Sequence, residues 1–584
     1  MKKILSILTV GCALTLSSCE DWLDKYPLAQ MSPETFFSNE NELQAFSNTF
    51  YTIFPGDGLY NEGYDNIVKN EIAAEMRDGR TIPASGGGWT WTDLRKFNTL
   101  LEYSGNCKDT DIRNRYDAVA RFFRAYFYFE KVKRFGDVPW YAKPLGSADP
   151  ELKRPRDSRE FVMQRMIEDI DFAIRYLPAE RDLYRVTKWT ALALKSRFCL
   201  FEGTFRKYHS IDGYEHDWKW YLEQAADAAE EFITNSGYSL YTATGPATSY
   251  RDLFASENAQ SVEVILARDY NSALGVFHNA NFYTISASYG KPGMTRKIVD
   301  SYLMADGSRF TDKAGWETME FKQQCSNRDP RLAESIVEFG TDFCGVVYDP
   351  RFDVEQVWDS NVGRNITNPD NIVTASESRL PSRTGLVQRK GIDKDWTDDY
   401  QADPDKIIMR YADVLLMYAE AKIELNEIDD ATLEAMNRVR ARAYGVQHTE
   451  TDKYPAIVTR SQSELRTILR TERRMEFAFE RLRIYDLLRW RIAEKVLNYS
   501  DWTIKYNAGA NVLKKVMTDG QWFIPTPAID ESGCPEMDAT FSRENRPHIT
   551  ALYNRVFNPE IHYLWPLPAT DVLVNKNLKQ NYGY

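Results

Sequence analysis

The spacing of the apolar residues constrains this chain of 584 residues more than any other feature. Segments with apolar side chains at helical intervals follow one another in pairs. The paired segments are 111–135 with 161–177, 189–205 with 218–234, 411–425 with 431–443, and 465–479 with 482–497. Such pairs bury their apolar faces by stacking on neighbouring pairs, as in tetratricopeptide-like solenoids. We therefore predict a mainly α fold of tetratricopeptide-like stacked helix pairs, with long irregular loop excursions and a few short strands.

Residues typical of helix N-termini precede several segments. They are Ser32-Pro33-Glu34 for a further helix that reaches about Phe54, Asp157 with Glu160 for 161–177, Thr187 for 189–205, and Ser461 with Glu464 for 465–479. Two stretches break the helical pattern, at 55–88 and at 238–407, and in the second only 261–266 has the pattern of a strand. Irregular stretches of this length in a compact protein are usually functional, so we expect a binding surface there.

The N-terminus has the pattern of a secretory signal. Lys2 and Lys3 precede an uncharged apolar segment at 4–16, which is too short to span a bilayer comfortably. The segment ends in Leu16-Ser17-Ser18-Cys19, which resembles the bacterial lipobox, in which the cysteine becomes the lipidated first residue of the mature chain. We predict a signal peptide at 1–18 and lipidation at Cys19, with the membrane reached through acyl chains. The alternative is an ordinary signal followed by a chance cysteine.

Composition excludes several classes of protein. The formal net charge is −12, which argues against a nucleic-acid binder with a basic stripe and against electrostatic docking on anionic lipid. The mean hydropathy of −0.51 excludes a multi-pass helical membrane protein. Beyond Cys19 the cysteines are odd in number and lack CxxC spacing, so we expect mostly buried thiols, with one disulfide pair still open. The cysteines beyond Cys19 are Cys107, Cys199, Cys325, Cys344 and Cys534.

Motifs of metal, nucleotide and hydrolase chemistry are missing from the sequence. The histidines form no HExxH and no pair at helical ligand spacing, and there is no Walker A, Rossmann or GxSxG fingerprint. We predict no cofactor and no metal, although an irregular structural calcium site stays open. The charged run 472–491 mixes arginines with Glu and Asp at helical spacing. It favours a structural ion-pair network over a phosphate site.

Several motifs in sequence order resemble the SusD/RagB family of surface glycan-binding lipoproteins of the Bacteroidota. They are Asp21-Trp22-Leu23-Asp24, Arg134-Phe135-Gly136-Asp137-Val138-Pro139, the run 410–421 (RYADVLLMYAEA), Asn437-Arg438-Val439-Arg440, the run 472–477 (ERRMEF), the run 483–490 (RIYDLLRW), Trp565-Pro566-Leu567-Pro568, and the run 577–584. Each motif is weak alone, but together behind a lipobox they are specific. Glu20 and Asp21 also resemble a surface-export signal of that phylum.

The resemblance implies a fold, a location and partners. The fold would be a SusD-like helical scaffold, with an N-terminal part at 19–236 and a RagB/SusD C-terminal part at 237–584 joined in one integrated fold. The protein would be lipid-anchored on the outer membrane and exposed at the cell surface. It would bind an oligosaccharide of a polysaccharide utilisation system and cap a SusC-type TonB-dependent transporter that carries the ligand inward. RagB-like members handle peptides instead.

Aromatic side chains in the irregular stretches are the candidate ligand-binding residues. Sugars stack their C–H faces on aromatic rings while their hydroxyls need planar polar partners, so exposed rings beside Asp or Arg are favoured. The candidates are Trp89 and Trp91 with Tyr60, Tyr64, Tyr283, Tyr289 and Trp316 as rings, and Arg77 and Asp78 as polar clamps. The glycines at 86–88 are expected to keep the approach to Trp89 and Trp91 open.

Two rival functions stay open at this point. An extracellular glycoside hydrolase needs only two suitably placed carboxylates, and Glu71, Glu75 and Asp78 lie in the aromatic stretch. A structural lid would leave all recognition to the transporter. We favour a non-catalytic, surface-anchored binding protein over both.

Overall fold

The computed structural model describes residues 35–584 apart from 57–59, 61–63, 69–73, 78, 246–247, 256–258, 282–292, 372–381, 393–400, 506–507 and 542–546, and leaves out the side chains of 74 and 75. The signal at 1–18, Cys19 and the Ser32-Pro33-Glu34 motif lie outside the described residues.

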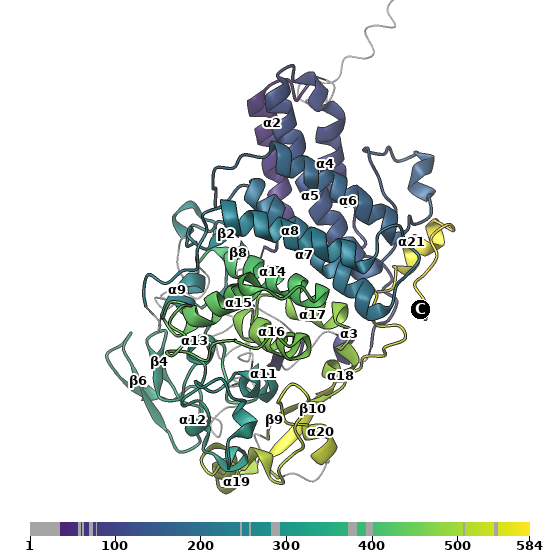
Figure 1. The fold of residues 1–584 in the computed structure, drawn as a ribbon. Helices are drawn as coiled ribbons and strands as arrows, with labels where there is room; N and C mark the ends of the chain where they lie inside the picture. The colour runs from purple at the N-terminus through teal and green to yellow at the C-terminus, as the bar shows by residue number, and fades with distance from the viewer. Residues whose placement is uncertain are drawn as a thin grey trace, which may run out of the picture.

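Helix pairs stack on one another, as the apolar spacing predicts, and form the helical layer of the molecule (Figure 1). The main helices are α4 (Thr92–Tyr103), α5 (Thr110–Phe135), α6 (Arg159–Tyr176), α7 (Lys188–His209), α8 (Trp218–Asn235), α14 (Tyr411–Leu425), α15 (Asp430–Ala443) and α16 (Gln462–Glu476). Helix α5 packs on α6, α7 on α8, and α14 on α15. Helix α14 also packs on α7 and α8, so helices from both halves of the chain share the layer.

Capping residues fix where these helices begin and end. The side chain of Thr187 accepts a hydrogen bond from the backbone N–H of Thr190 at the start of α7, as predicted. Gly136, at a φ of 73°, ends α5 in a conformation that favours glycine. The predicted capping boxes of α6 and α16 are wrong. Ser158 caps α6 instead of Asp157, and the Ser461 side chain makes no capping bond because its hydroxyl lies 3.1 Å from that of Ser463.

Two predicted helices are shorter than expected. Helix α2 (Glu40–Ser47) begins after Asn39, whose side chain accepts from the N–H of Glu42, and continues as the 3-10 helix η2 (Asn48–Ile53). The segment 482–497 forms two short helices, α17 (Arg483–Arg489) and α18 (Ala493–Leu497). Arg491 between them has a φ of 52°, a left-handed conformation that breaks the helix.

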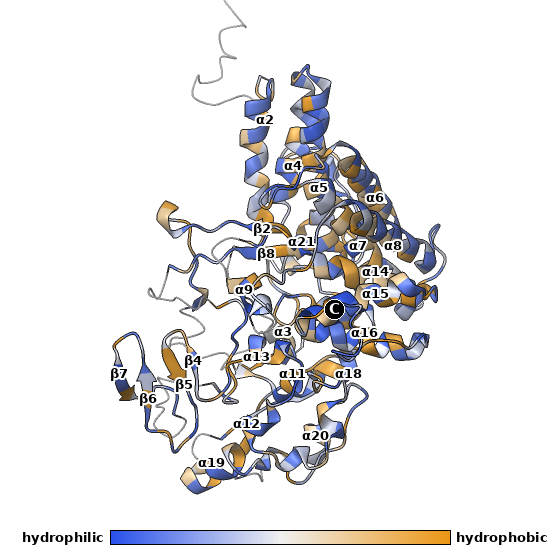
Figure 2. Cartoon of the chain, turned by 60° about the vertical axis from the view of Figure 1, so that its left-hand side comes forward, coloured by the Kyte–Doolittle hydropathy of each residue, from blue (hydrophilic) through white to orange (hydrophobic). Residues whose placement is uncertain are grey.

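Apolar side chains from α5, α7 and α14 fill the centre of the helical layer. Helix α14 is buried around almost its whole circumference, and Figure 2 shows hydrophobic residues gathered on it and on α7. A helix that is apolar on all sides belongs in the interior of a layered structure. None of the helices in the described part of the chain is both long and apolar enough to cross a bilayer.

Short strands and helices build a second region around a separate apolar cluster. The strand pairs are antiparallel: β1 (Ile67–Val68) with β3 (Gly293–Met294), β2 (Val264–Arg268) with β8 (Lys406–Arg410), and β9 (Ser500–Ile504) with β10 (Ile549–Asn554). A four-stranded sheet has the order β4 (Thr341–Phe343), β5 (Val346–Tyr348), β6 (Gln356–Asp359), β7 (Arg364–Thr367). The short helices around this cluster are α9 (Ser249–Ala255), α11 (Arg296–Ser301), α12 (Phe321–Gln324), α13 (Arg331–Ser335), α19 (Ala510–Met517) and α20 (Met537–Thr540). Two more short helices, α3 (Ala74–Arg77) and α21 (Ala569–Val574), pack against the main apolar core.

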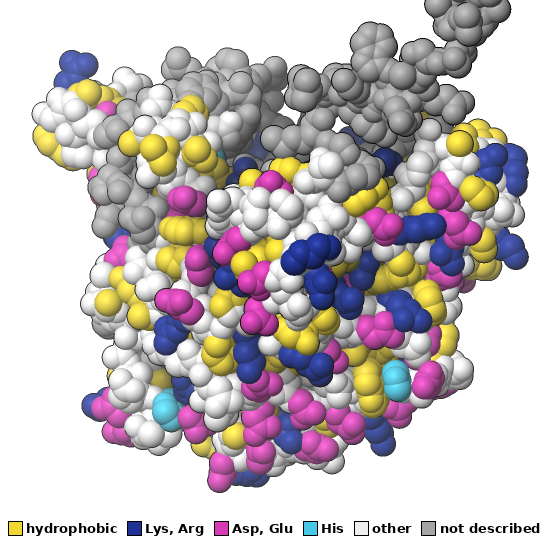
Figure 3. Space-filling view, turned by 90° about the horizontal axis from the view of Figure 1, so that it is seen from above, with side chains coloured by type: hydrophobic (Ala, Val, Ile, Leu, Met, Phe, Trp, Pro, Cys, Tyr) yellow, Lys and Arg dark blue, Asp and Glu magenta, His cyan; other side chains and the backbone are white. Residues whose placement is uncertain are grey.

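The charged run 472–491 forms a buried ion-pair network, which confirms the structural interpretation. The carboxylate of Glu476 accepts hydrogen bonds from Arg331 at 3.0 Å, from Arg410 at 2.7 Å and from Arg442. Asp486 accepts from Arg473 and Arg489. Paired charges of this kind are tolerated in an interior because each keeps its hydrogen bonds. On the face seen from above, acidic and basic side chains are intermixed (Figure 3).

Candidate functional site

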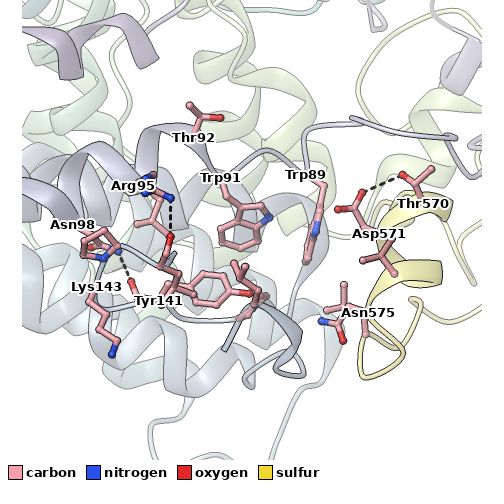
Figure 4. A pocket seen from close by; sticks show the side chains of 17 residues that line it. Trp89, Trp91, Thr92, Arg95, Asn98, Tyr141, Lys143, Thr570, Asp571 and Asn575 are labelled. Carbon is pink, nitrogen blue, oxygen red and sulfur yellow. Dashed lines mark hydrogen bonds between the residues drawn. The ribbon is translucent and has the colours of Figure 1, made fainter. Parts of the chain in front are cut away.

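A pocket of about 540 Å³ opens between the loop before α4, the loop after α5 and the C-terminal helix α21. We call it the Trp91 pocket (Figure 4). It is lined by Trp89, Trp91, Thr92, Leu94, Arg95, Asn98, Pro139, Tyr141, Lys143, Pro144, Leu145, Leu152, Thr570, Asp571, Val574, Asn575 and Leu578. Its size lies within the range of roughly 300–1,000 Å³ usual for small-molecule sites, and apolar and aromatic side chains dominate its lining.

Aromatic rings form the wall of the pocket. The half-buried indole of Trp91 meets the ring of Tyr141 edge to face, with centroids 5.4 Å apart and planes at 85°. Trp89 contacts Trp91 at 5.2 Å and Phe135 at 4.9 Å, both edge to face. Phe127 on α5 lies 5.6 Å from Trp91. Edge-to-face contacts on several sides fix the orientation of Trp91 before any ligand arrives.

The glycines before Trp89 shape the turn that delivers both indoles. Gly86, Gly87 and Gly88 have φ values of 74°, 57° and 87°, which favour glycine. A Cβ on Gly88 would lie 3.0 Å from Nε of Arg134, and the Trp89 N–H donates to the Gly86 carbonyl at 2.8 Å. The glycines therefore allow a turn that a side chain would strain, and the expectation that they keep the approach to the rings open stays a prediction.

Polar groups of the pocket hold its loops in place. The Asn98 amide donates to the backbone carbonyl of Tyr141 at 2.8 Å, and its oxygen accepts from buried Arg124 at 3.1 Å. Arg95 donates to the Leu145 carbonyl at 2.7 Å. Asn575 after α21 donates to the Arg154 carbonyl at 3.0 Å. The loop after α5 is thus pinned from α4 and from the C-terminal segment at once.

A buried lysine on α5 contacts Trp91 in the wall of the pocket. The ammonium of Lys131 on α5 lies 4.6 Å from the ring centroid of Phe127 and 5.7 Å from that of Trp91, and it donates to the Gly88 carbonyl. Burial lowers the pKa of Lys131 to about 8. The lysine links the glycine turn to α5 through one hydrogen bond and two cation–π contacts.

Trp89 and Trp91 are the predicted residues that the structure brings together in one pocket. Trp91 is half-buried, whereas Trp89 is only 6% exposed and presents little surface. Tyr64 is half-buried against the main core, and Arg77 lies 5.8 Å from the ring of Tyr553; neither lines the Trp91 pocket. Asp78, Tyr283 and Tyr289 lie outside the described residues.

The expectation that Tyr60 and Trp316 offer exposed rings is wrong. Tyr60 is 2% exposed, its hydroxyl accepts from the Ile407 N–H at 3.0 Å, and Lys406 lies 3.3 Å from its ring centroid. Trp316 is 5% exposed and packs 4.8 Å from Phe523. Both rings belong to the second apolar cluster, so no ligand can stack on them in this structure.

Sequence reasoning missed most of the pocket. Tyr141 and Lys143 follow α5 without any motif, and Asp571 and Asn575 come from the far end of the chain. Trp140-Tyr141, which directly follows Pro139, was the one available signal. Among the tryptophans that the structure describes, only Trp358 on β6 is exposed, at 49%, and it was not among the predicted binding residues.

Glu71, Asp78 and the side chain of Glu75, the carboxylates expected to serve a hydrolase, lie outside the described residues. No group of three His, Cys, Asp or Glu side chains that could hold a metal ion occurs among the described residues. Asp571 is the single carboxylate among the residues that line the Trp91 pocket. Cys107, Cys199, Cys325, Cys344 and Cys534 are free thiols in the structure, and all but Cys325 are buried.

Two sequence profiles match the chain. The profile described as the SusD family matches residues 253–584, which is more than half of the chain. A second, described as starch-binding and associating with the outer membrane, matches residues 21–200.

Curated relatives and solved structures agree with these matches. A SusD-like protein of Bacteroides ovatus is 25% identical over 90% of this chain and 91% of its own length. The SusD-like protein P25 of Formosa agariphila is 24% identical over 84% of this chain and 91% of its own length. A solved SusD-like carbohydrate-binding protein of Bacteroides fragilis superposes on this chain with a TM-score of 0.70 at 22% identity. The match covers 94% of this chain and 100% of that chain. This likeness confirms the predicted helical fold.

Proposed function

Because the chain belongs to the SusD family, we propose that it is a cell-surface lipoprotein that captures an oligosaccharide in the Trp91 pocket. The observation that carries the proposal is the half-buried Trp91 held against Tyr141 in a pocket of about 540 Å³. Glycan binding fits the family, in which relatives are described as carbohydrate-binding.

The pocket suits a sugar for physical reasons. The C–H face of a pyranose ring packs on an indole, and Trp91 is already oriented by Tyr141, Phe127 and Trp89. Ordering costs at the ring are therefore small, which favours binding. Lys143 and Asp571 line the pocket and offer charged groups to sugar hydroxyls, and the Thr570 hydroxyl, which donates to the Ala84 carbonyl at 2.8 Å, can still accept.

Capture without turnover is the expected behaviour. Glycoside hydrolysis by the usual routes needs two carboxylates about 5–10 Å apart. The described lining of the Trp91 pocket contains only Asp571. We propose a binding protein on this ground, and the hydrolase alternative is tested by looking for shortened ligand.

The same proposal includes anchoring and a partner. Lipidation at Cys19 would hold the protein at the outer membrane, exposed at the cell surface. A SusC-type TonB-dependent transporter would receive the captured ligand for import. The profile described as associating with the outer membrane supports this location, and the transporter is inferred from the family.

A titration panel tests the proposal. Isothermal titration calorimetry of the chain from residue 20 onward, against plant, host and microbial oligosaccharides, should give saturable binding to one glycan class. Chromatography of each sample should recover the ligand intact, whereas shortened product would establish a hydrolase. Peptides belong in the same panel. Binding to peptides alone would favour the RagB-like alternative, and binding to neither would favour a lid without a site.

Co-purification tests the partner. The full chain, expressed in its own outer membrane with an affinity tag, should bring down a TonB-dependent transporter from detergent extract. A Cys19→Ala variant should leave the outer-membrane fraction. Recovery of the protein alone, or a membrane location unaffected by Cys19→Ala, would contradict this part of the proposal.

A further inference from the structure

A second pocket of about 540 Å³ is lined by residues of α16, α11 and α18 and of the turn at 530–536. We call it the α16 pocket. Its lining residues are Lys297, Ser301, Thr467, Arg470, Thr471, Arg474, Arg483, Trp490, Ile492, Lys495, Val496, Asp530, Glu531, Ser532 and Glu536. It shares no lining residue with the Trp91 pocket.

The α16 pocket carries an excess of positive charge. Five basic side chains line it against three acidic ones, and most of the basic groups already have an acidic partner. Arg474 and Arg483 share the buried carboxylate of Asp65, each at 3.1 Å. The outer lysines pair with the turn at 530–536, Lys297 with Asp530 at 3.5 Å and Lys495 with Glu531 at 2.8 Å.

Arg470 differs from these groups. Its Nε and Nη2 have no hydrogen-bond partner, and no ion pair of Arg470 occurs in the described part of the chain. Its guanidinium lies 4.8 Å from the ring centroid of Trp490 and 5.3 Å from that of Tyr208, which restricts its position. Arg474, whose side chain is 4% exposed, also has an Nε without a partner.

The unused edge of Arg470 is the edge with which two other arginines of this chain bind carboxylates. Arg466, one turn earlier on α16, holds Glu424 through Nε at 2.7 Å and Nη2 at 3.0 Å. Arg124 holds Asp169 through the same two nitrogens, at 2.6 and 2.7 Å. Two parallel N–H donors match the two oxygens of a carboxylate, so this edge is specific for a planar oxyanion. At Arg470 the same two nitrogens are buried and unpaired, so a ligand in the pocket reaches them only when the side chain rotates away from Trp490.

We infer that the α16 pocket binds the carboxylate of an acidic sugar, a hexuronic acid unit of an oligosaccharide, through Arg470 and Arg474. The saccharide part of this inference rests on the proposed function. Thr467 and Thr471 flank the arginines on α16 and provide hydroxyls for the sugar ring. A sulfate ester on a sugar presents similar oxyanion oxygens, and the experiment separates the two sources.

Calorimetric titrations with three matched ligands test the inference. The ligands are trigalacturonate, a sulfated galactotriose and neutral galactotriose, each at low and high salt. Trigalacturonate should bind, and Arg470→Gln should weaken it by about tenfold or more, because a charged bidentate contact is lost. Arg470→Lys, which keeps the charge and the aromatic contacts, should recover only part of the affinity. Arg165→Gln, at an exposed arginine on α6, is the control and should change nothing.

The titrations distinguish a carboxylate ligand from a sulfate ester and from the absence of a ligand at the α16 pocket. If the sulfated galactotriose binds in a way that depends on Arg470 and trigalacturonate does not bind, the recognised group is a sulfate ester and the carboxylate assignment is wrong. No binding of trigalacturonate, or binding that is lost with Trp91→Ala but kept in both Arg470 variants, would overturn the inference. Free galacturonate should also displace trigalacturonate from the α16 pocket. If it binds Arg470-dependently while no neutral glycan binds anywhere, the inference stands and the proposed function fails.

Discussion

The indole of Trp91 and the phenol ring of Tyr141 meet edge to face at 5.4 Å, although they come from segments separated by the whole of α4 and α5. The contact joins the glycine turn before α4 to the loop after α5. Asn98 secures it from the side by binding the Tyr141 carbonyl. The pocket wall is therefore preorganised by packing and by backbone hydrogen bonds, which keeps the entropic cost of ligand binding low.

Asn98→Ala should weaken both the fold and the site. The variant leaves the Tyr141 carbonyl without a partner and Nη1 of Arg124 with only its 3.4 Å bond to the Ala142 carbonyl, so the free energy of unfolding should fall by about 1–3 kcal/mol. Glycan affinity should fall as well, because Tyr141 loses its anchor. Thr99→Ala, next to it on α4, removes only a hydroxyl bonded to its own helix and should be nearly neutral. Urea unfolding and calorimetry measure the two effects, and equal affinities for Asn98→Ala and wild type would contradict the anchoring role.

Gly88→Ala should destabilise the protein by about 1–3 kcal/mol. The residue has a φ of 87°, and a Cβ would lie 3.0 Å from Nε and 3.1 Å from Cδ of Arg134. Gly146→Ala in the loop after α5 is the matched control, since a Cβ there meets no atom within 4 Å. Thermal unfolding of the two variants should differ clearly. Similar melting temperatures would show that the turn tolerates a side chain at position 88.

Lys131 predicts a rise in stability with pH. Its pKa is about 8 in the folded chain against 10.5 ordinarily, so between these values the unfolded chain binds a proton that the folded chain has released. The contribution of Lys131 is complete above pH 10.5 and is lost as the pH falls toward 8. Lys131→Met has no group at this position that titrates in this range. From pH 7.5 to 9.5, wild type should gain about 2 kcal/mol relative to the variant in urea unfolding. Parallel curves for the two proteins would contradict the assignment.

Glu424 predicts a loss of stability in acid. Burial alone would raise the pKa of Glu424, but the hydrogen bonds and charges of Arg466 and Lys207 lower it to about 2 from 4.5. Its contribution is present above pH 4.5 and is lost as the pH falls toward 2. Wild type should lose roughly 2–3 kcal/mol more than Glu424→Gln over this interval. The exposed Glu168→Gln should follow wild type, and unfolding curves at pH 3 and 6 make the comparison.

The helices could be predicted because their signal is local. Apolar spacing located α5, α7 and α14 within a few residues, and Thr187 marked a helix start correctly. The break at Arg491 could not be predicted, because nothing in the sequence there indicates a left-handed residue. The N–H of Ile492 donates back to the Leu487 carbonyl at 3.1 Å across this residue. The helical fold was thus predictable, but not the interruption of 482–497.

The candidate site was predictable only where its residues are neighbours in sequence. Trp89 and Trp91 lie two positions apart beside three glycines, so their proximity followed directly. Tyr141 and Asn575 reach the same pocket from distant segments, and one sequence contains no sign of such contacts. Trp316 sits in an irregular stretch that resembled a binding loop, yet that stretch encloses an apolar cluster of its own. Loop composition therefore did not separate buried rings from available ones.

Calorimetry on tryptophan variants tests the central claim most directly. The glycan identified in the panel should bind Trp91→Ala about tenfold to a hundredfold more weakly than wild type, the usual effect of removing an aromatic anchor. Trp220→Ala, half-buried on α8, and Trp358→Ala, at the exposed ring on β6, should bind like wild type. Unchanged affinity for Trp91→Ala in a folded protein, or a loss confined to Trp358→Ala, would contradict capture in the Trp91 pocket.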